Sequence, residues 1–274
     1  MTDLSALVLD IDGTLVCGGK PLSERNLAAL QRCRDQGLII YVATARPQHL
    51  VLRPEEAGPE ADFLAGRGAF YSGAMVLDRP RNTYSLHFFP EDLVEFALEA
   101  LEEASEDVQI VLQRPDGTHA FRQPVTDSML PGWGIGREDI VDFEEARREG
   151  CLRMIVFHPE PGQRIGPLRE AVEDAVGDYA AVRMADSGLW MELLSDRASK
   201  EGALEELFEI ADISPARVAA FGDDNSDAGL FELCGVSVAM ADAPDELKER
   251  ATHVTLSCEE DGVAHGIEEI LGVI

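Results

Sequence analysis

Short apolar runs alternate with amphipathic segments at both ends of the 274-residue chain. The run from Ala6 to Asp10 predicts a buried strand, and Ser23 predicts the cap of a helix that continues to Asp35. A second apolar strand is expected over residues 38–44. Strands that alternate with helices in this way are typical of a parallel sheet whose ligands bind beyond the carboxyl ends of the strands.

The same alternation returns near the C-terminal end of the chain. The expected elements there are strands at 191–195, 218–224 and 235–240, a helix that begins at Lys200, and helices over 227–233 and 262–271. Both ends of the chain are therefore predicted to build one α/β core.

Residues 80–186 show a different pattern, with long charged helices and isolated apolar strands. The expected elements are helices at 90–104 and 166–176 and strands at 108–113 and 152–158. We therefore predict a doubly wound parallel-sheet core of residues 1–79 and 187–274, with an α+β unit of residues 80–186 inserted into it.

The charge of the chain disfavours nucleic acids and membranes as partners. The sequence has 52 acidic and 23 basic residues and a formal net charge of −29, which repels phosphate backbones and anionic lipids. No apolar run approaches the length of a membrane span, and we expect no secretion signal because the N-terminal segment lacks a basic region. Lysine is so rare, with only Lys20, Lys200 and Lys248, that a lysine within a motif is informative.

The cysteines indicate neither a disulfide framework nor a zinc site. They are far apart and lack a C-x-x-C spacing, so reduced thiols and a cytoplasmic location fit best. Cys17, which lies close to the first acidic turn, could be an oxidisable thiol near the site, and a small filler side chain is the preferred interpretation. The five positions are Cys17, Cys33, Cys151, Cys234 and Cys258.

Charged and hydroxyl side chains follow the expected core strands. Asp10 and Asp12 end the first strand, Thr44 ends the second, Lys200 opens a helix, and the run GDDNSD occupies 222–227. Because the carboxyl ends of parallel strands share one edge of a sheet, we expect these groups to converge. Carboxylates suit Mg²⁺, and lysine and threonine suit phosphate oxygens. Two neighbouring aspartates can supply a nucleophile and a general acid/base.

Each feature also has a purely structural explanation. Asp10 and Asp12 could form a solvated turn, Asp223 and Asp227 could favour a helix N-terminus, and Thr44 could cap a helix. Because these residues occur together and in this order, we favour a functional site over separate structural roles.

Four segments in order, DIDGT, VATAR, SKEGAL and AFGDDNSDAGLF, resemble the motifs of the haloacid dehalogenase (HAD) superfamily. They are most similar to its Cof-type phosphatases, which carry a large inserted α/β cap of the C2 type. The resemblance covers the two ends of the chain, and over residues 80–186 only the position and size of a cap match. It implies a HAD-like catalytic core and a cap that selects the substrate.

The resemblance also implies roles for individual residues. Asp10 would be the nucleophile that forms an aspartyl-phosphate, Asp12 the general acid/base, and Thr44 and Lys200 the groups that hold the phosphoryl group. The implied ligands of Mg²⁺ are Asp10, Asp12 through its backbone carbonyl, Asp223, and Asp227 directly or through water. The implied phosphate-binding residues are Ile11, Gly13, Thr44, Ala45, Arg46, Lys200 and Ser226. Arg46 could equally lie on a helix surface.

The sequence departs from the pattern of the family at three places. Ser226 stands where an asparagine is expected, and Asn225 lies one place early. Residues 44–46 read Thr-Ala-Arg in place of Thr-Gly-Arg, and the Asn-Gly-Ala stretch of the family corresponds either to 67–69 or to 72–74. The ambiguity of the Asn-Gly-Ala stretch concerns substrate contacts and not the reaction type. Ser226 can still donate to a phosphate oxygen with a shorter reach, and this departure leaves room for a catalytically silent protein.

The predicted function is Mg²⁺-dependent hydrolysis of a small phosphomonoester, with a sugar phosphate as the first choice, in the cytoplasm. Candidate substrate-selecting residues of the cap are Arg114, His119, Arg122 and Trp133. Two alternatives stay open: a phosphomutase or other phosphotransferase on the same scaffold, and a catalytically silent HAD-like binding protein. The sequence predicts no oligomeric state.

Overall fold

The two ends of the chain form one unit, and the middle of the chain forms another. The computed structural model describes residues 4–18, 20–52, 56–104, 107–185 and 188–273. The first unit comprises Met1–Ser85 and Ser199–Ile274, and the second comprises Leu86–Ala198. Within the described ranges no helix combines the length and the apolar character needed to span a membrane.

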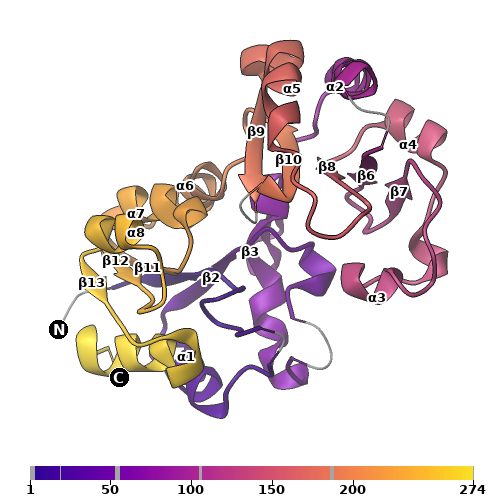
Figure 1. Ribbon diagram of the computed structural model, residues 1–274. Coiled ribbons are helices and arrows are strands. Elements are labelled where there is room, and N and C mark those ends of the chain that lie inside the picture. The colour runs from indigo at the N-terminus through magenta and orange to yellow at the C-terminus, as the bar shows by residue number, and fades with distance from the viewer. Residues whose placement is uncertain (1–3, 19, 53–55, 105–106, 186–187, 274) are drawn as a thin grey trace. The chain divides into compact units, whose positions relative to one another are not determined.

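An eight-stranded sheet forms the centre of the first unit (Figure 1). Its strand order is β13-β12-β11-β1-β2-β3-β4-β5; all neighbours from β13 to β3 are parallel, and β3 pairs with β4 in antiparallel fashion. The strands are β1 (Ala6–Leu9), β2 (Ile39–Ala43), β3 (Arg67–Phe70), β4 (Met75–Asp78), β5 (Thr83–Leu86), β11 (Val218–Gly222), β12 (Val236–Ala239) and β13 (His253–Val254). The parallel part confirms the predicted order of strands and helices.

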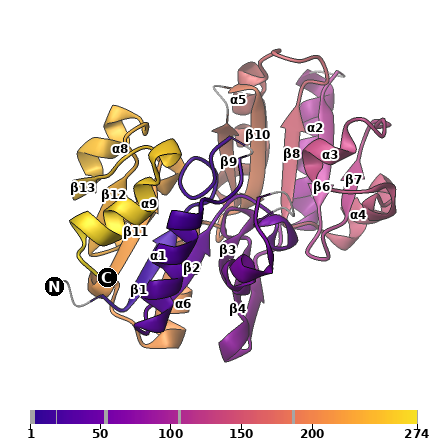
Figure 2. The same cartoon turned by 90° about the horizontal axis from the view of Figure 1, so that it is seen from below.

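Helices cover both faces of this sheet. In Figure 1 α6, α7 and α8 lie on one face, and α1 and the C-terminal helix α9 lie on the other, as the second view in Figure 2 also shows. The helices are α1 (Glu24–Asp35), α6 (Lys200–Ala211), α7 (Ala228–Leu233), α8 (Asp245–Arg250) and α9 (Gly262–His265), which continues as a π-helical turn (Gly266–Ile270). This is the doubly wound α/β architecture that the pattern predicted.

The local signals for α1 are confirmed. Ser23 caps the helix, and its hydroxyl accepts a hydrogen bond from the backbone N–H of Asn26 at 3.0 Å. Gly37 follows the helix with a positive φ of 91°, a conformation that glycine adopts without steric cost. The chain then enters β2, which pairs with the fully buried β1.

The second unit is built on an antiparallel sheet with the strand order β7-β6-β8-β10-β9. Its strands are β6 (Gln109–Gln113), β7 (His119–Phe121), β8 (Arg153–Phe157), β9 (Ala180–Ala185) and β10 (Trp190–Ser195). Its helices are α2 (Glu91–Ala104), α3 (Leu130–Trp133), α4 (Phe143–Glu149) and α5 (Arg169–Val176). Apolar side chains of α2, α4 and α5 pack on one face of this sheet and form the core of the unit.

Residues 191–195 form a strand as predicted, but the prediction that this strand belongs to the core sheet is wrong. The strand exists as β10, but it pairs with β8 and β9 in the second unit. The units therefore divide after Ser85 and after Ala198, later in the chain than the predicted limits. Residues 186–187, at the second predicted limit, lie outside the described residues. An apolar strand before a helix resembles a βα unit, and only its pairing with β8 and with β9, the strand directly before it, decides its sheet.

Candidate active site

Asp10 is the first residue after β1, and its side chain is buried. Its backbone N–H donates to the carbonyl of Phe221 in β11 at 3.1 Å. The chain therefore leaves β1 beside the end of β11, whose following loop carries Asp223 and Asp227. Parallel pairing of β1 with β11 is what brings these two acidic segments together.

The turn after Asp10 is closed by backbone hydrogen bonds. The Ile11 carbonyl accepts the N–H groups of Leu15 and Val16 at 3.0 and 2.8 Å. The N–H of Gly13 donates to the Val16 carbonyl at 2.9 Å. Gly13 has a φ of 86°, and a Cβ at this position would collide with the carboxylate of Asp223. Glycine is therefore required for the turn to approach Asp223.

Lys200 joins the two acidic segments. It is the first residue of α6, after the capping residue Ser199, and only 6% of its side chain is exposed. Its Nζ donates to Asp10 Oδ1 at 2.6 Å and to Asp227 Oδ1 at 2.8 Å. It also reaches Ser226 Oγ at 3.5 Å. Burial acts to lower the pKa of Lys200, but the charges of the two aspartates outweigh it and raise this pKa, so the ammonium stays charged.

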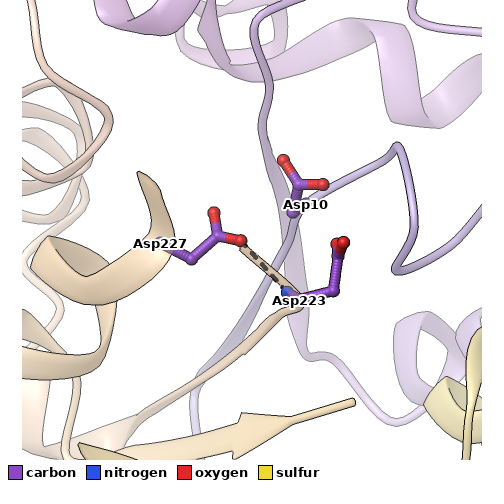
Figure 3. Close-up of side chains that lie close together, drawn as sticks. All are labelled: Asp10, Asp223 and Asp227. Carbon is purple, nitrogen blue, oxygen red and sulfur yellow. Dashed lines mark hydrogen bonds between the residues drawn. The ribbon is translucent and has the colours of Figure 1, made fainter. Parts of the chain in front are cut away.

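Asp227 is fully buried, and both of its carboxylate oxygens are engaged. Oδ1 accepts from Lys200, and Oδ2 accepts the backbone N–H groups of Asp223 at 3.1 Å and Asp224 at 3.3 Å. Figure 3 shows the bond to Asp223. This arrangement makes Asp227 the anchor of both Lys200 and the loop after β11.

Asp10 and Asp223 are crowded carboxylates. Burial raises the pKa of Asp10 well above its usual range; Lys200 opposes this shift, and the charges of Asp227 and Asp223 add to it. Burial likewise raises the pKa of Asp223 to about 7, although the Thr14 hydroxyl, which donates to Asp223 Oδ1 at 2.7 Å, opposes the shift. The ionised forms of Asp10 and Asp223 are therefore stable only with more positive charge nearby than Lys200 supplies.

A divalent cation fits this cluster. Oxygen atoms of Asp10, Asp223 and Asp227 lie within 4.8 Å of one another (Figure 3). Hard cations such as Mg²⁺ prefer carboxylate oxygens and keep part of their water shell. Since the oxygens of Asp227 are already hydrogen-bonded, Asp10 and Asp223 are the carboxylates with room for such an ion.

Asp12 and Arg46 form a second charged cluster in the same unit. The side chain of Asp12 is 63% exposed, and its carboxylate accepts two hydrogen bonds from Arg46, with Nε–Oδ2 at 2.8 Å and Nη2–Oδ1 at 2.5 Å. The other side of the guanidinium pairs with Glu56, which is 1% exposed. Burial acts to lower the pKa of Arg46, but hydrogen bonds to Asp12 and Glu56 raise it. Arg46 therefore faces Asp12 and does not lie on a helix surface.

Thr44 follows β2 and is buried. Its hydroxyl accepts the backbone N–H of Arg46 at 3.1 Å, and its carbonyl accepts the N–H of Ser72 at 3.0 Å. The next helical segment described is a short 3-10 helix (Gln48–Leu50), so Thr44 caps a turn and not an α-helix. This capping leaves the hydroxyl hydrogen available to a phosphate oxygen.

The two stretches that could correspond to the Asn-Gly-Ala of the family lie in and just after β3. Residues 67–69 lie within β3, and Arg67 Nε pairs with Asp78 at 3.2 Å. Ser72 has a φ of 55°, and a Cβ on Gly73 would collide with the carbonyl of Ser199, the residue before Lys200. Residues 72–74 therefore lie beside Thr44 and the start of α6.

Most of the proposed site residues come together, although not in one cluster. Lys200 connects Asp10, Asp227 and Ser226, and Arg46 connects Asp12 to the turn at Thr44. Ile11 is buried in the core, Ala45 is exposed, and the N–H of Gly13 is used within its own turn.

Sequence reasoning missed Thr14 and Glu56. Thr14 belongs to the DIDGT motif, so its hydroxyl was a signal that could have been used. Glu56 lies in a charged stretch without periodicity, and no local pattern distinguishes it from its neighbours.

The expectation that all cysteines are reduced is wrong for two of them. Cys17 and Cys258 form a disulfide, while Cys33, Cys151 and Cys234 are free and buried. The bonded pair is separated by 241 residues, so spacing could not reveal it. Cys17 is thus a covalent tie between the turn after β1 and the C-terminal segment, and the cysteine argument for a cytoplasmic location fails for this pair.

Two of the candidate cap residues lie in an aromatic cluster of the second unit. The ring of Trp133 lies 5.9 Å from His119, 5.8 Å from Phe157 and 6.3 Å from Trp190. His119 is buried, and its Nε2 is 2.7 Å from Nε2 of Gln113. Trp133 thus packs against both buried and partly exposed aromatic rings of this unit.

The two arginine candidates in the same unit form ion pairs. Arg114 pairs with Glu149 at 2.7 Å, and Arg122 pairs with Glu102 at 2.8 Å. Both acidic partners are about half exposed, so water weakens these pairs.

Comparison with known proteins identifies the family. The sequence matches the haloacid dehalogenase-like hydrolase family over residues 7–267, so the chain belongs to that family. It is 26% identical to the putative phosphatase YxeH of Bacillus subtilis over 97% of each chain. It is 25% identical to the 5-amino-6-(5-phospho-D-ribitylamino)uracil phosphatase YitU of the same organism over 96% of each chain.

Solved structures show the same fold. The HAD subclass IIB sugar phosphatase BT4131 superposes with a TM-score of 0.81 at 21% identity, covering 98% of this chain and 100% of that one. A haloacid dehalogenase-like hydrolase from Bacteroides thetaiotaomicron superposes with a TM-score of 0.81 at 22% identity, covering 97% and 99%. The predicted resemblance to Cof-type HAD phosphatases is therefore confirmed, and the chain is an enzyme of the phosphatase type.

Proposed function

We propose that this haloacid dehalogenase-like phosphatase hydrolyses a small phosphomonoester with Mg²⁺, through an aspartyl-phosphate on Asp10. The observation that carries the proposal is the buried Lys200, which pairs with Asp10 and Asp227 while the Asp223 carboxylate lies within 4.8 Å of both. Crowded carboxylates beside one lysine suit a site that gathers a cation and a phosphate.

The metal-binding groups follow from the hydrogen bonds. Asp10 and Asp223 would supply carboxylate oxygens and Asp12 its backbone carbonyl, while Asp227 supports the site from behind because its oxygens are engaged. Bound there, Mg²⁺ would supply positive charge next to the oxygens of the phosphoryl group.

In the first step, a carboxylate oxygen of Asp10 attacks phosphorus and the bond from phosphorus to the ester oxygen breaks. Asp12 gives its proton to that leaving oxygen, and the alcohol departs. In the second step, a water oxygen attacks the aspartyl-phosphate and Asp12 takes a proton from the water. The bond between phosphorus and Asp10 breaks, which releases phosphate and restores both carboxyl groups.

Side chains around Asp10 hold the phosphoryl group during these steps. Lys200 and the Thr44 hydroxyl bind its oxygens, and Ser226, at 3.5 Å from Lys200, supplies a further hydroxyl in place of the asparagine of the family. Ile11 and Ala45 contribute backbone groups. Arg46 serves Asp12, since its guanidinium already pairs with two carboxylates.

We assign the substrate to the small phosphorylated metabolites, with a sugar or polyol phosphate as the first choice. The printed substrate of YitU, a phosphorylated ribitylaminouracil, belongs to this class. A cytoplasmic location remains part of this proposal.

The test is phosphate release from a panel of small phosphomonoesters by the wild type and Asp10→Asn, each with Mg²⁺ or with a chelator. We expect release that needs both Mg²⁺ and Asp10. Asp35→Asn, at the exposed end of α1, is the matched control. Formation of an isomer without free phosphate would favour a phosphomutase, and no turnover of any ester by folded wild type would contradict the proposal.

A further inference from the structure

The guanidinium of Arg46 lies between two carboxylates and uses all its donors. Nε and Nη2 donate to Asp12, Nη2 also donates to Glu56 Oε1 at 3.0 Å, and Nη1 donates to Glu56 Oε2 at 2.5 Å. Nη1 further reaches the carbonyls of Val51 at 3.2 Å and Leu50 at 3.4 Å. Since an arginine has five N–H donors in a planar fork, this set of acceptors determines the plane of the group.

The two carboxylates differ in their surroundings. Asp12 is 63% exposed, and Glu56 is 1% exposed. The backbone carbonyl of Glu56 also accepts the N–H of Leu22 at 2.6 Å, which ties the loop of Glu56 to the segment before α1. A buried carboxylate is stable only when it is paired, so Glu56 holds Arg46 firmly from the protein side.

The orientation of Asp12 depends on this pairing. The hydrogen bonds of its side chain, in the part of the chain that the structure describes, come from Arg46. Its carboxylate is otherwise open to water, so the angle at which it meets a leaving oxygen follows from the plane of the guanidinium.

We propose that Glu56 is a positioning residue: it holds Arg46, and Arg46 in turn orients Asp12 for proton transfer. The inference rests on the proposed function, because it assigns to Asp12 the general acid/base role. Glu56 touches neither substrate nor metal in this scheme. Its effect passes through the guanidinium, where small errors of orientation reduce proton transfer strongly.

The first test compares two esters. In Glu56→Gln an amide N–H₂ replaces one acceptor and faces the Arg46 donors, so the guanidinium tilts and Asp12 loses its orientation. We expect kcat for a sugar phosphate, whose alkoxide needs a proton, to fall about 30- to 100-fold. The first step with p-nitrophenyl phosphate, whose leaving group needs no proton, should change less than about threefold. Because water attack still needs Asp12, p-nitrophenol should appear in a burst stoichiometric with enzyme.

The matched control is Glu60→Gln, which removes the same charge from an exposed glutamate of the same segment and should behave as wild type. Arg46→Lys is the second variant; it keeps the charge but lacks the planar fork, and should show the same burst. Thermal unfolding of every variant identifies one that has lost its fold, and Arg46→Lys then carries the comparison if Glu56→Gln does not fold.

A double-mutant cycle with Asp12→Asn decides whether Glu56 acts through Asp12. We expect Glu56→Gln to slow the wild type but to leave Asp12→Asn unchanged within about twofold, because its effect requires the Asp12 carboxylate. Equal losses in both backgrounds, or equal losses on both esters without a burst, would overturn the inference while the phosphatase function stands. A wild type without activity on any ester would overturn the proposed function and this inference together.

Discussion

The site contains two clusters of the same form, built from different cations. In each, one cation joins an aspartate to which we assign a catalytic role to a second, buried carboxylate: Lys200 joins Asp10 to Asp227, and Arg46 joins Asp12 to Glu56. The anchors Asp227 and Glu56 are 0% and 1% exposed. A buried acid thus holds the cation, and the cation holds the reacting acid.

The difference between the clusters lies in the geometry of the cation. Lysine is a compact point charge, which suits Lys200 because the phosphoryl oxygens must share it with two carboxylates. Arginine is a planar fork, which suits Arg46 because Asp12 needs a defined direction. The lysine cluster is therefore interpreted as electrostatic and the arginine cluster as orienting, and the predictions below test that distinction.

The largest effect is expected from removal of the charge of Lys200. Lys200→Met leaves Asp10, Asp223 and Asp227 crowded without their internal cation, so kcat with saturating Mg²⁺ should fall by at least about 10³-fold. Lys248→Met removes another of the three lysines, one that pairs at 3.7 Å with Asp245, and should keep wild-type activity. Steady-state kinetics measure both. A Lys200→Met enzyme within tenfold of wild type would contradict an electrostatic role.

Removal of the Asp227 charge, which anchors Lys200, should lower activity less than Lys200→Met does, and it should also lower the stability of the fold. Asp227→Asn keeps an acceptor for the loop but removes a buried charge partner of Lys200. We expect kcat to fall about 100-fold and the free energy of unfolding in urea to fall by roughly 3 kcal/mol. Asp224→Asn, at an exposed neighbouring aspartate, is the control for stability. Unchanged stability in Asp227→Asn would show that the ion pair between Lys200 and Asp227 does not stabilise the fold.

Reduction of the disulfide should affect stability about as much as Asp227→Asn and should affect activity far less. Cys17 lies just beyond the turn that carries Asp10 and Asp12, and its bond to Cys258 closes a long loop. A dithiol reductant, or Cys17→Ser with Cys258→Ser, should lower the free energy of unfolding by about 2–4 kcal/mol. The kcat values should stay within about threefold, because both clusters retain their partners. Equal stability of oxidised and reduced protein in urea would argue against this tie.

The remaining effect is a pH dependence of the stability of the metal-free protein. Burial raises the pKa of Asp223 to about 7 in the folded state, above the ordinary value of 3.8. The folded state therefore binds more protons than the unfolded state between these values, so this group makes stability fall as pH rises from about 4 to about 7. Saturating Mg²⁺ should raise the unfolding temperature by roughly 5 °C at pH 8 and by less at pH 5.

The control for this pH effect is Asp223→Asn, in which the slope that Asp223 causes should disappear and the Mg²⁺ effect should shrink. A metal-free protein whose unfolding temperature rises steadily between pH 5 and pH 8, and is the same in Asp223→Asn, would contradict the assignment. Differential scanning fluorimetry in buffers of constant ionic strength measures all of these values.

The sequence by itself determined the features that depend on neighbours in the chain. The apolar run of β1, the cap of α1 and the DIDGT turn are local, because hydrogen bonds and side-chain periodicity over a few residues specify them. The candidate residues Asp10 and Asp227 could be grouped because parallel strands place their carboxyl ends at one edge of a sheet. Lys200 joins them in the structure, although the strand that precedes it belongs to the other sheet.

Only the tertiary structure decided features that join distant segments. The disulfide between Cys17 and Cys258 and the pairing of Glu56 with Arg46 follow from partners that no local pattern specifies. The sheet to which β10 belongs follows from its pairing with β8 and β9. The local sequence of a strand does not show which sheet it joins. The local sequence around a glutamate does not show whether its side chain is buried. Pairing and burial are settled by the free energy of the whole packed chain, since desolvation and long-range contacts arise only when that chain folds.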